Sequence, residues 1–200
     1  MSRRLVQGVG INDADYVTVQ YERYYLEGKS KQRLVWVCPF YKRWKGLLER
    51  CYSEKYHKKH PSYSGCTVTE DWKYFSKFKA WMEEQRWENN ELDKDLLVDG
   101  NKVYSPETCV FVSRLVNSFI VNSKQSKGPY LVGVCFNKVL GKFQALCSQL
   151  NDKQKHLGYF DSEEDAHKAW KAEKFRLACL LANEQKDPRV AEALIKKFKE

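Results

Sequence analysis

The chain has 200 residues, 42% of them apolar, which is enough to bury one sizeable core or two small ones. Its formal net charge of +9 is spread as +5 over residues 1–126, +3 over 127–182 and +1 over 183–200, which favours an extended surface facing a polyanion. No apolar run approaches the ~18 residues of a membrane-spanning helix, so a membrane partner is not expected.

The cysteines indicate a reducing compartment. No pair has CxxC spacing, and residues 1–4 lead into a polar segment rather than a secretory leader. An odd number of cysteines without such a leader predicts free thiols in a cytoplasm. A zinc site remains an alternative, although its ligands would be irregularly spaced. Its candidate ligands are Cys38, Cys51, Cys66, His57 and His60.

The N-terminal part of the chain predicts a β-hairpin. Residues 16–21 alternate at period two, and a polar turn at 27–31 separates them from an apolar segment at 34–37. Pro39 then ends the second strand.

Two amphipathic helices are predicted next, over residues 40–56 and 71–86, from apolar side chains at helical spacing. Their aromatic side chains are interpreted as core, because a chain with 14% aromatic residues has to bury most of them. The polar face of the first helix and the basic loop at 55–60 offer cations to DNA phosphates. These candidate DNA contacts are Lys42, Arg43, Lys58 and Lys59.

Residues 92–112 predict a strand, a turn at Gly100-Asn101, a polar loop and a second strand, with a helix following. This layout resembles the ββα-metal region of phage-type HNH homing endonucleases. Together with a C-terminal module of a kind that those proteins often carry, the resemblance extends from about Gly10 to Trp170. Upstream segments that fit it are 44–52, 63–68 and 72–78.

The resemblance implies a degenerate catalytic site. In that family a metal-binding Asp is followed by a His base, and an Asn completes the site; here Asp93 matches the Asp, while Lys94 and Thr108 stand in place of the other two. A lysine with an ordinary pKa near 10 is protonated at neutral pH and is a poor base. Asp93 and Asp95, joined by Glu107, could still hold Mg²⁺ or another hard divalent cation. The preferred alternative is that Asp93 and Asp95 brace the turn and that cleavage has been lost.

The C-terminal third predicts a β-β-β-α module. Three alternating segments, 131–136, 142–147 and 155–160, precede a helix whose start is marked by Asp161-Ser162 and three acidic residues. The order of these segments and their amino-acid sequences resemble the ethylene-response-factor (APETALA-type) DNA-binding domain. The matching residues are Gly133-Val134, Gly141-Lys142-Phe143, Leu157–Asp161, Glu163-Glu164, Ala166, Ala169 and Trp170.

That resemblance implies duplex DNA bound in the major groove by the exposed face of the sheet. Val132 and Cys135 replace the usual first-strand arginines, and Leu146 replaces a polar position, so sharp sequence specificity is not expected. The candidate phosphate or base-edge partners are Asn137, Lys138, Lys142, Gln144, Lys155 and His156.

The expected fold class is α+β, with a degenerate ββα-metal region followed by a small three-stranded antiparallel sheet and one packed helix. The expected domains are 1–120 and 128–182, joined by a linker at 118–129 and followed by a C-terminal helix at 186–200.

Three functions remain open. The first is double-stranded DNA binding by a phage-type protein derived from an HNH endonuclease, with weak or lost cleavage. The second is an active Mg²⁺-dependent homing endonuclease. The third is a protein that binds a host or phage protein as an inhibitor or accessory factor. In each case the cytoplasm, that of the host cell for a phage-encoded chain, is the expected location.

Overall fold

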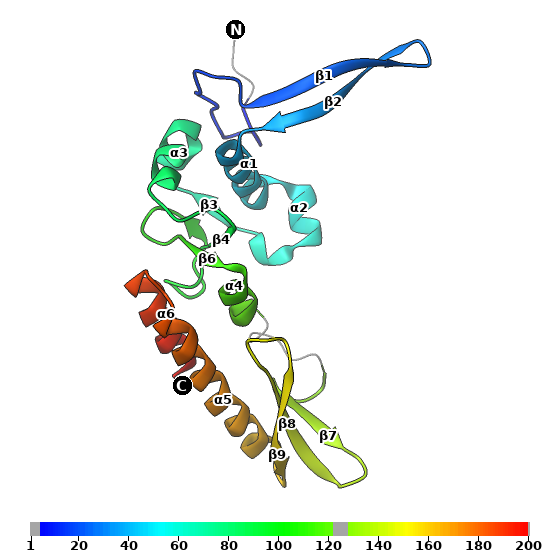
Figure 1. The fold of residues 1–200 in the computed structure, drawn as a ribbon, viewed down its shortest axis with the longest axis vertical. Coiled ribbons are helices and arrows are strands. Elements are labelled where there is room, and N and C mark those ends of the chain that lie inside the picture. Colours follow the sequence, from blue (N-terminus) through cyan, green and yellow to red (C-terminus); the bar gives the residue numbers. More distant parts are fainter. Residues whose placement is uncertain (1–4, 122–127, 200) are drawn as a thin grey trace. The chain divides into compact units, whose positions relative to one another are not determined.

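A computed structural model describes residues 5–121 and 128–199, and it confirms the α+β class (Figure 1). The chain divides into two compact units. The first unit comprises residues 1–88 and 100–109, and the second comprises residues 89–99 and 110–200. In the described parts of the chain, no helix is both long enough and apolar enough to cross a bilayer.

The first unit combines a hairpin with a small helical core. Its elements are β1 (Val19–Leu26), β2 (Lys29–Val37), α1 (Pro39–Tyr52), α2 (Glu54–Lys59), η1 (Pro61–Tyr63), β3 (Thr67–Val68), η2 (Asp71–Lys73), α3 (Phe75–Glu83) and β5 (Val103–Tyr104). The core is aromatic: Trp44 from α1 lies among buried rings of η2 and α3, and its indole N–H donates to the Trp72 carbonyl at 2.7 Å. The interpretation of these aromatic residues as core is therefore confirmed for Trp44, Trp72, Phe75 and Phe78.

Both predicted helices of this unit are shorter than expected. The segment predicted as one helix over 40–56 is interrupted at Ser53, which has extended backbone angles and whose hydroxyl accepts from the Tyr56 N–H to start α2. Tyr74 is likewise extended and separates the 3-10 turn η2 from α3. Serine side chains compete for backbone groups in this way, so a serine inside a helical pattern favours a cap.

The second unit contains the β-β-β-α module, a further strand pair and two further helices. Its elements are β4 (Asn90–Asp93), β6 (Val110–Ser113), α4 (Arg114–Val121), β7 (Val134–Asn137), β8 (Lys142–Ser148), β9 (Gln154–Phe160), α5 (Glu163–Asn183) and α6 (Pro188–Phe198). β4 and β6 pair antiparallel and α4 follows, which gives a ββα order. β7, β8 and β9 form an antiparallel sheet in that order.

The unit boundary differs from the predicted linker at 118–129. Residues 118–121 complete α4, and residues 122–127 lie outside the described part of the chain. The physical reason is apolar burial, because β6 and α4 share one core with α5 and α6. Val112, Val116 and Ile120 pack in that core with Leu177, Leu181 and Leu194.

The three-stranded sheet packs closely on α5 at Gly133, in the loop before β7. Gly133 has φ +82°, and a Cβ at this position would overlap the indole of Trp170 on α5. Trp170 is 7% exposed and stacks on His167, whose Nδ1 lies 2.9 Å from the Val132 carbonyl oxygen. The loop entering β7 is therefore fixed against the helix by one close backbone approach.

Gly133→Ala is expected to destabilise the second unit by about 3 kcal/mol, from overpacking against Trp170 and the strain of a positive φ. Gly141→Ala is the matched control. Gly141 also has a positive φ (+62°), but nothing lies within 4 Å of the added Cβ, so the loss should be about 1 kcal/mol. Urea unfolding followed by circular dichroism measures both, and equal losses would contradict the role given to the Trp170 contact.

Candidate nucleic-acid interface

The β7–β8–β9 sheet has one face against α5, and its other face is open to solvent and also lines a pocket through Cys135, Leu146, Ser148 and Gln154. Along β8, Ala145 and Cys147 are buried on the helix side, while the intervening residues point the other way because side chains alternate along a strand. The strand register then assigns the neighbours: Cys135 and Tyr159 lie beside Gln144, and His156 lies beside Leu146. This outer face is predominantly polar.

Four of the predicted DNA contacts lie on or at the rim of this outer face. Asn137 and Lys142 are paired across β7 and β8, and the Lys142 ammonium lies 3.0 Å from a carboxylate oxygen of Asp161 in an exposed pair. Gln144 occupies the middle of the face. The His156 ring lies against the Tyr159 ring, with centroids 4.6 Å apart. The outer face therefore presents polar side chains together with two exposed rings, those of His156 and Tyr159.

Two further predicted contacts have different surroundings. Lys138 is exposed in the turn between β7 and β8, where Asn137 Oδ1 accepts from two backbone N–H groups and holds the turn. Lys155 is paired with Cys147 and therefore lies on the helix side, where its ammonium donates to Glu173 Oε1 at 3.2 Å. Lys155 is thus an internal partner of α5 in this structure.

Glu173 on α5 links the helix to the sheet through ion pairs with basic side chains. Its carboxylate accepts from Arg176 and Lys155, and the Arg176 hydrogen bond is the main reason its pKa falls to about 2. Arg176 also contacts an amide side chain, because its Nη2 donates to Gln149 Oε1 at 3.4 Å. The ion pairs brace the end of the sheet away from the β7–β8 turn.

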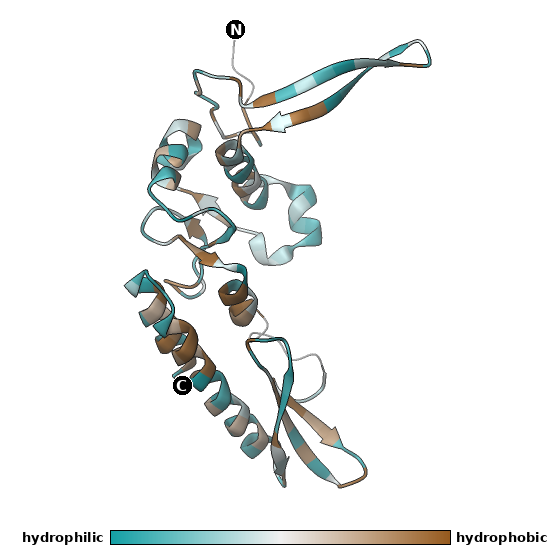
Figure 2. Ribbon diagram, viewed as in Figure 1, coloured by the Kyte–Doolittle hydropathy of each residue, from teal (hydrophilic) through white to brown (hydrophobic). Residues whose placement is uncertain are grey.

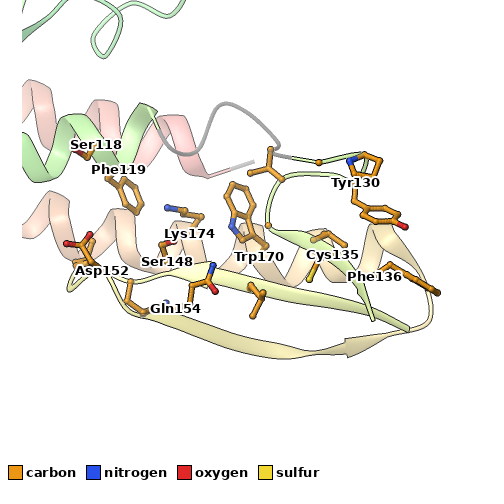
Figure 3. Close-up of a pocket in the computed structure, with 18 of the residues that line it drawn as sticks. Ser118, Phe119, Tyr130, Cys135, Phe136, Ser148, Asp152, Gln154, Trp170 and Lys174 are labelled. Carbon is orange, nitrogen blue, oxygen red and sulfur yellow. The ribbon is translucent and has the colours of Figure 1, made fainter. Parts of the chain in front are cut away.

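A pocket of about 520 Å³ opens beside the same sheet, between the 128–136 segment, β8 and the helices α4 and α5 (Figure 3). Its inner wall includes Phe119, Trp170 and Lys174. Lys174 is only 4% exposed, its ammonium lies 4.1 Å from the Phe119 ring centroid, and burial lowers its pKa. Sequence reasoning missed Lys174, although its place between Trp170 and Ala178 on the buried stripe of α5 was a readable signal.

The degenerate catalytic residues are held by local contacts. Asp93 Oδ1 accepts from the backbone N–H of Asp95 at 2.8 Å and of Leu96 at 2.6 Å, so this carboxylate braces the turn after β4. The Lys94 ammonium pairs with Asp95 Oδ1 at 2.5 Å. Asp93 and Lys94 belong to the second unit, whereas Thr108 belongs to the first. The Thr108 hydroxyl donates to the Val103 carbonyl at 2.8 Å. The structure thus shows a turn-bracing role for Asp93.

No group of three or more His, Cys, Asp or Glu side chains suited to a metal ion occurs within residues 5–121 and 128–199. All seven cysteines are in the thiol form, and His57 Nε2 lies 2.8 Å from the Arg50 carbonyl oxygen. The four basic candidates of the first unit lie on α1 and α2, with Lys42, Lys58 and Lys59 exposed and Arg43 half-buried.

Comparison with known proteins adds no relative. No protein-family model matches the chain, and neither a curated protein nor a solved structure is significantly similar to it.

Asp93→Ala is expected to lower the free energy of unfolding by about 1–2 kcal/mol, because two backbone donors lose their acceptor. Asp93→Asn keeps an oxygen acceptor and should retain most of the stability. Thermal unfolding of both variants and of the parent, each with and without about 5 mM Mg²⁺, measures these changes in stability. A Mg²⁺-dependent stabilisation present in the parent and absent from Asp93→Asn would instead assign Asp93 to a metal site.

Glu173→Gln is expected to remove a pH-dependent part of the stability. The pKa of Glu173 is lowered by folding, so its contribution is complete above its unfolded pKa and is lost as the pH falls toward about 2. We expect a loss of about 1–2 kcal/mol at pH 7 after allowance for solvent screening. The variant should approach the parent in stability between pH 4 and 2, a range of about two units. Parallel curves for the two proteins across this range would contradict the assignment.

Proposed function

We propose that the chain binds double-stranded DNA through the outer face of β7, β8 and β9. The observation that carries the proposal is the group of polar side chains Asn137, Lys142, Gln144 and His156 on one face of a sheet braced by α5. Amide and ammonium groups are the types that contact phosphate oxygens and base edges. The net charge of +9 supports a polyanionic partner.

The buried side of the sheet explains how such a face would be presented. α5 covers the other side, and its Ser162 hydroxyl caps the helix by accepting from the Asp165 N–H. Gly133, Trp170 and the Glu173 ion pairs fix the sheet on this helix. A rigid support reduces the side-chain and backbone ordering required on binding.

The other two functions predicted from the sequence give different results in the same assays. An active endonuclease would nick a supercoiled plasmid in the presence of Mg²⁺ or Mn²⁺, and Asp93→Ala would abolish nicking. A protein-binding factor would show no salt-dependent shift of duplex DNA. A plasmid-nicking assay beside a gel shift therefore separates the three.

The proposal predicts strongly salt-dependent duplex binding. Neutralising ~4–6 phosphates should reduce the affinity roughly a hundredfold or more between about 50 and 200 mM salt. Lys142→Ala should weaken binding to all duplexes and make the salt dependence shallower, because a phosphate contact carries no base information. The measurement is a gel shift over a salt series on two duplexes of unrelated sequence.

Lys168→Ala is the control, because Lys168 is an exposed lysine on α5 paired with Asp165 and lies outside the outer sheet face. Its removal changes the net charge equally. The proposal is overturned if the parent gives no shift at micromolar protein, or if Lys142→Ala and Lys168→Ala affect binding alike.

A further inference from the structure

The β1–β2 hairpin of the first unit is a well-formed ribbon with little cover. Among residues 5–121 and 128–199 its strands pair only with each other, and every residue of β1 and β2 is exposed except the half-buried Val19 and Val37 at the base. The two-residue turn is Glu27-Gly28, both at positive φ, which is the turn geometry whose twist matches that of a hairpin. An isolated two-stranded ribbon is marginal in water, so a partner that covers it would stabilise it.

The register gathers cations on one face of this ribbon. Lys29, Lys31 and Arg33 occupy every second position of β2, and their side chains therefore share a face. Leu26, Tyr24 and Glu22 lie opposite them on β1, and Arg33 binds Glu22 with an N–O distance of 2.6 Å. The remaining cations of this face lie near the tip, where Lys29 is opposite the exposed Leu26 and Lys31 is opposite the exposed Tyr24.

The composition of the ribbon points to a polyanion. Residues 19–37 contain four cationic and two anionic side chains. Figure 2 shows hydrophilic colouring over much of the outer ribbon and hydrophobic colouring near its base, where Leu34 and Val35 lie. The strands are about 25–30 Å long, and a two-stranded β-ribbon fits the ~12 Å wide major groove of B-DNA.

We propose that the basic face of the β1–β2 hairpin, formed by Lys29, Lys31, Tyr24 and Leu26, enters the major groove of duplex DNA. It would be a second DNA contact, distinct from the outer face of the β7–β8–β9 sheet, and it rests on the proposed DNA binding. In this arrangement Lys29 and Lys31 on β2 contact phosphates, and Tyr24, which pairs with Lys31 across the ribbon, faces the groove from β1.

Pairing between two copies of the hairpin is less compatible with the same features. Lysines on an edge strand and the irregular register between Gln20 and Tyr21 are features that oppose edge-to-edge association. Two basic faces would also repel one another. Duplex DNA provides the complementary charge that a second copy does not.

The test is the double variant Lys29→Gln/Lys31→Gln, with Lys168→Gln/Lys171→Gln on α5 as the control of equal charge change. In gel shifts at about 0.1 M salt the hairpin variant should bind roughly tenfold or more weakly than the parent, and its salt slope should fall by about 2. The control should stay within about twofold of the parent. Circular dichroism checks that both variants fold, since exposed lysines cost little to replace.

Limited trypsin digestion gives a second readout. The exposed hairpin of the free parent should be cut after Lys29 or Lys31, and a saturating duplex should protect it. A parent that binds DNA while the hairpin variant matches it, with no protection from trypsin, overturns the hairpin contact and leaves the sheet intact as the DNA face. A parent without any gel shift overturns both proposals. Protection that depends on protein concentration without DNA, together with a dimer in sedimentation, would assign the ribbon to a second copy instead.

Discussion

The close approach of Gly133 to Trp170 is the constraint on which the C-terminal part of the molecule depends. It places the loop before β7 directly on α5, so that the small sheet has a fixed support although it contributes few buried side chains of its own. The rest of α5 is shared, because Leu177 and Leu181 pack in one core with α4, β6 and α6. One long helix therefore supports the sheet at one end and a larger apolar core at the other.

That double use of α5 explains which features could be predicted from the sequence. The hairpin, the β-β-β-α order and the start of α5 at Ser162 follow from period-two alternation, turn residues and capping chemistry, all of which act within a few residues. The boundary of the second unit could not be found in this way. Residues 89–99 and 110–121 join it through apolar contacts with α5 and α6, and α5 begins only at Glu163, far along the chain.

Some residues of the candidate site could likewise be predicted from local sequence pattern, and others depend on the pairing of distant segments. Strand alternation from Lys142 to Gln144 gives the outer face of the sheet, and His156 follows once the β8–β9 register is known. Lys155 is next to His156 in the sequence and points to the opposite face, where Glu173 binds it. A single residue of register decides which of two neighbouring polar side chains lies on the outer face of the sheet, and composition alone does not contain that information.

The charges of the two units also differ in how they are compensated. On the outer sheet face Lys142 has only an exposed partner in Asp161, and on the hairpin Glu22 neutralises Arg33 while Lys29 and Lys31 have no carboxylate opposite them. Each surface offers few cations, so each would bind DNA weakly alone. Two weak contacts on one chain reinforce one another, because binding of the first raises the effective concentration of the second. For the proposed DNA binding, an excess charge that is distributed rather than concentrated in one patch therefore predicts modest affinity at each face and strong salt dependence of the whole.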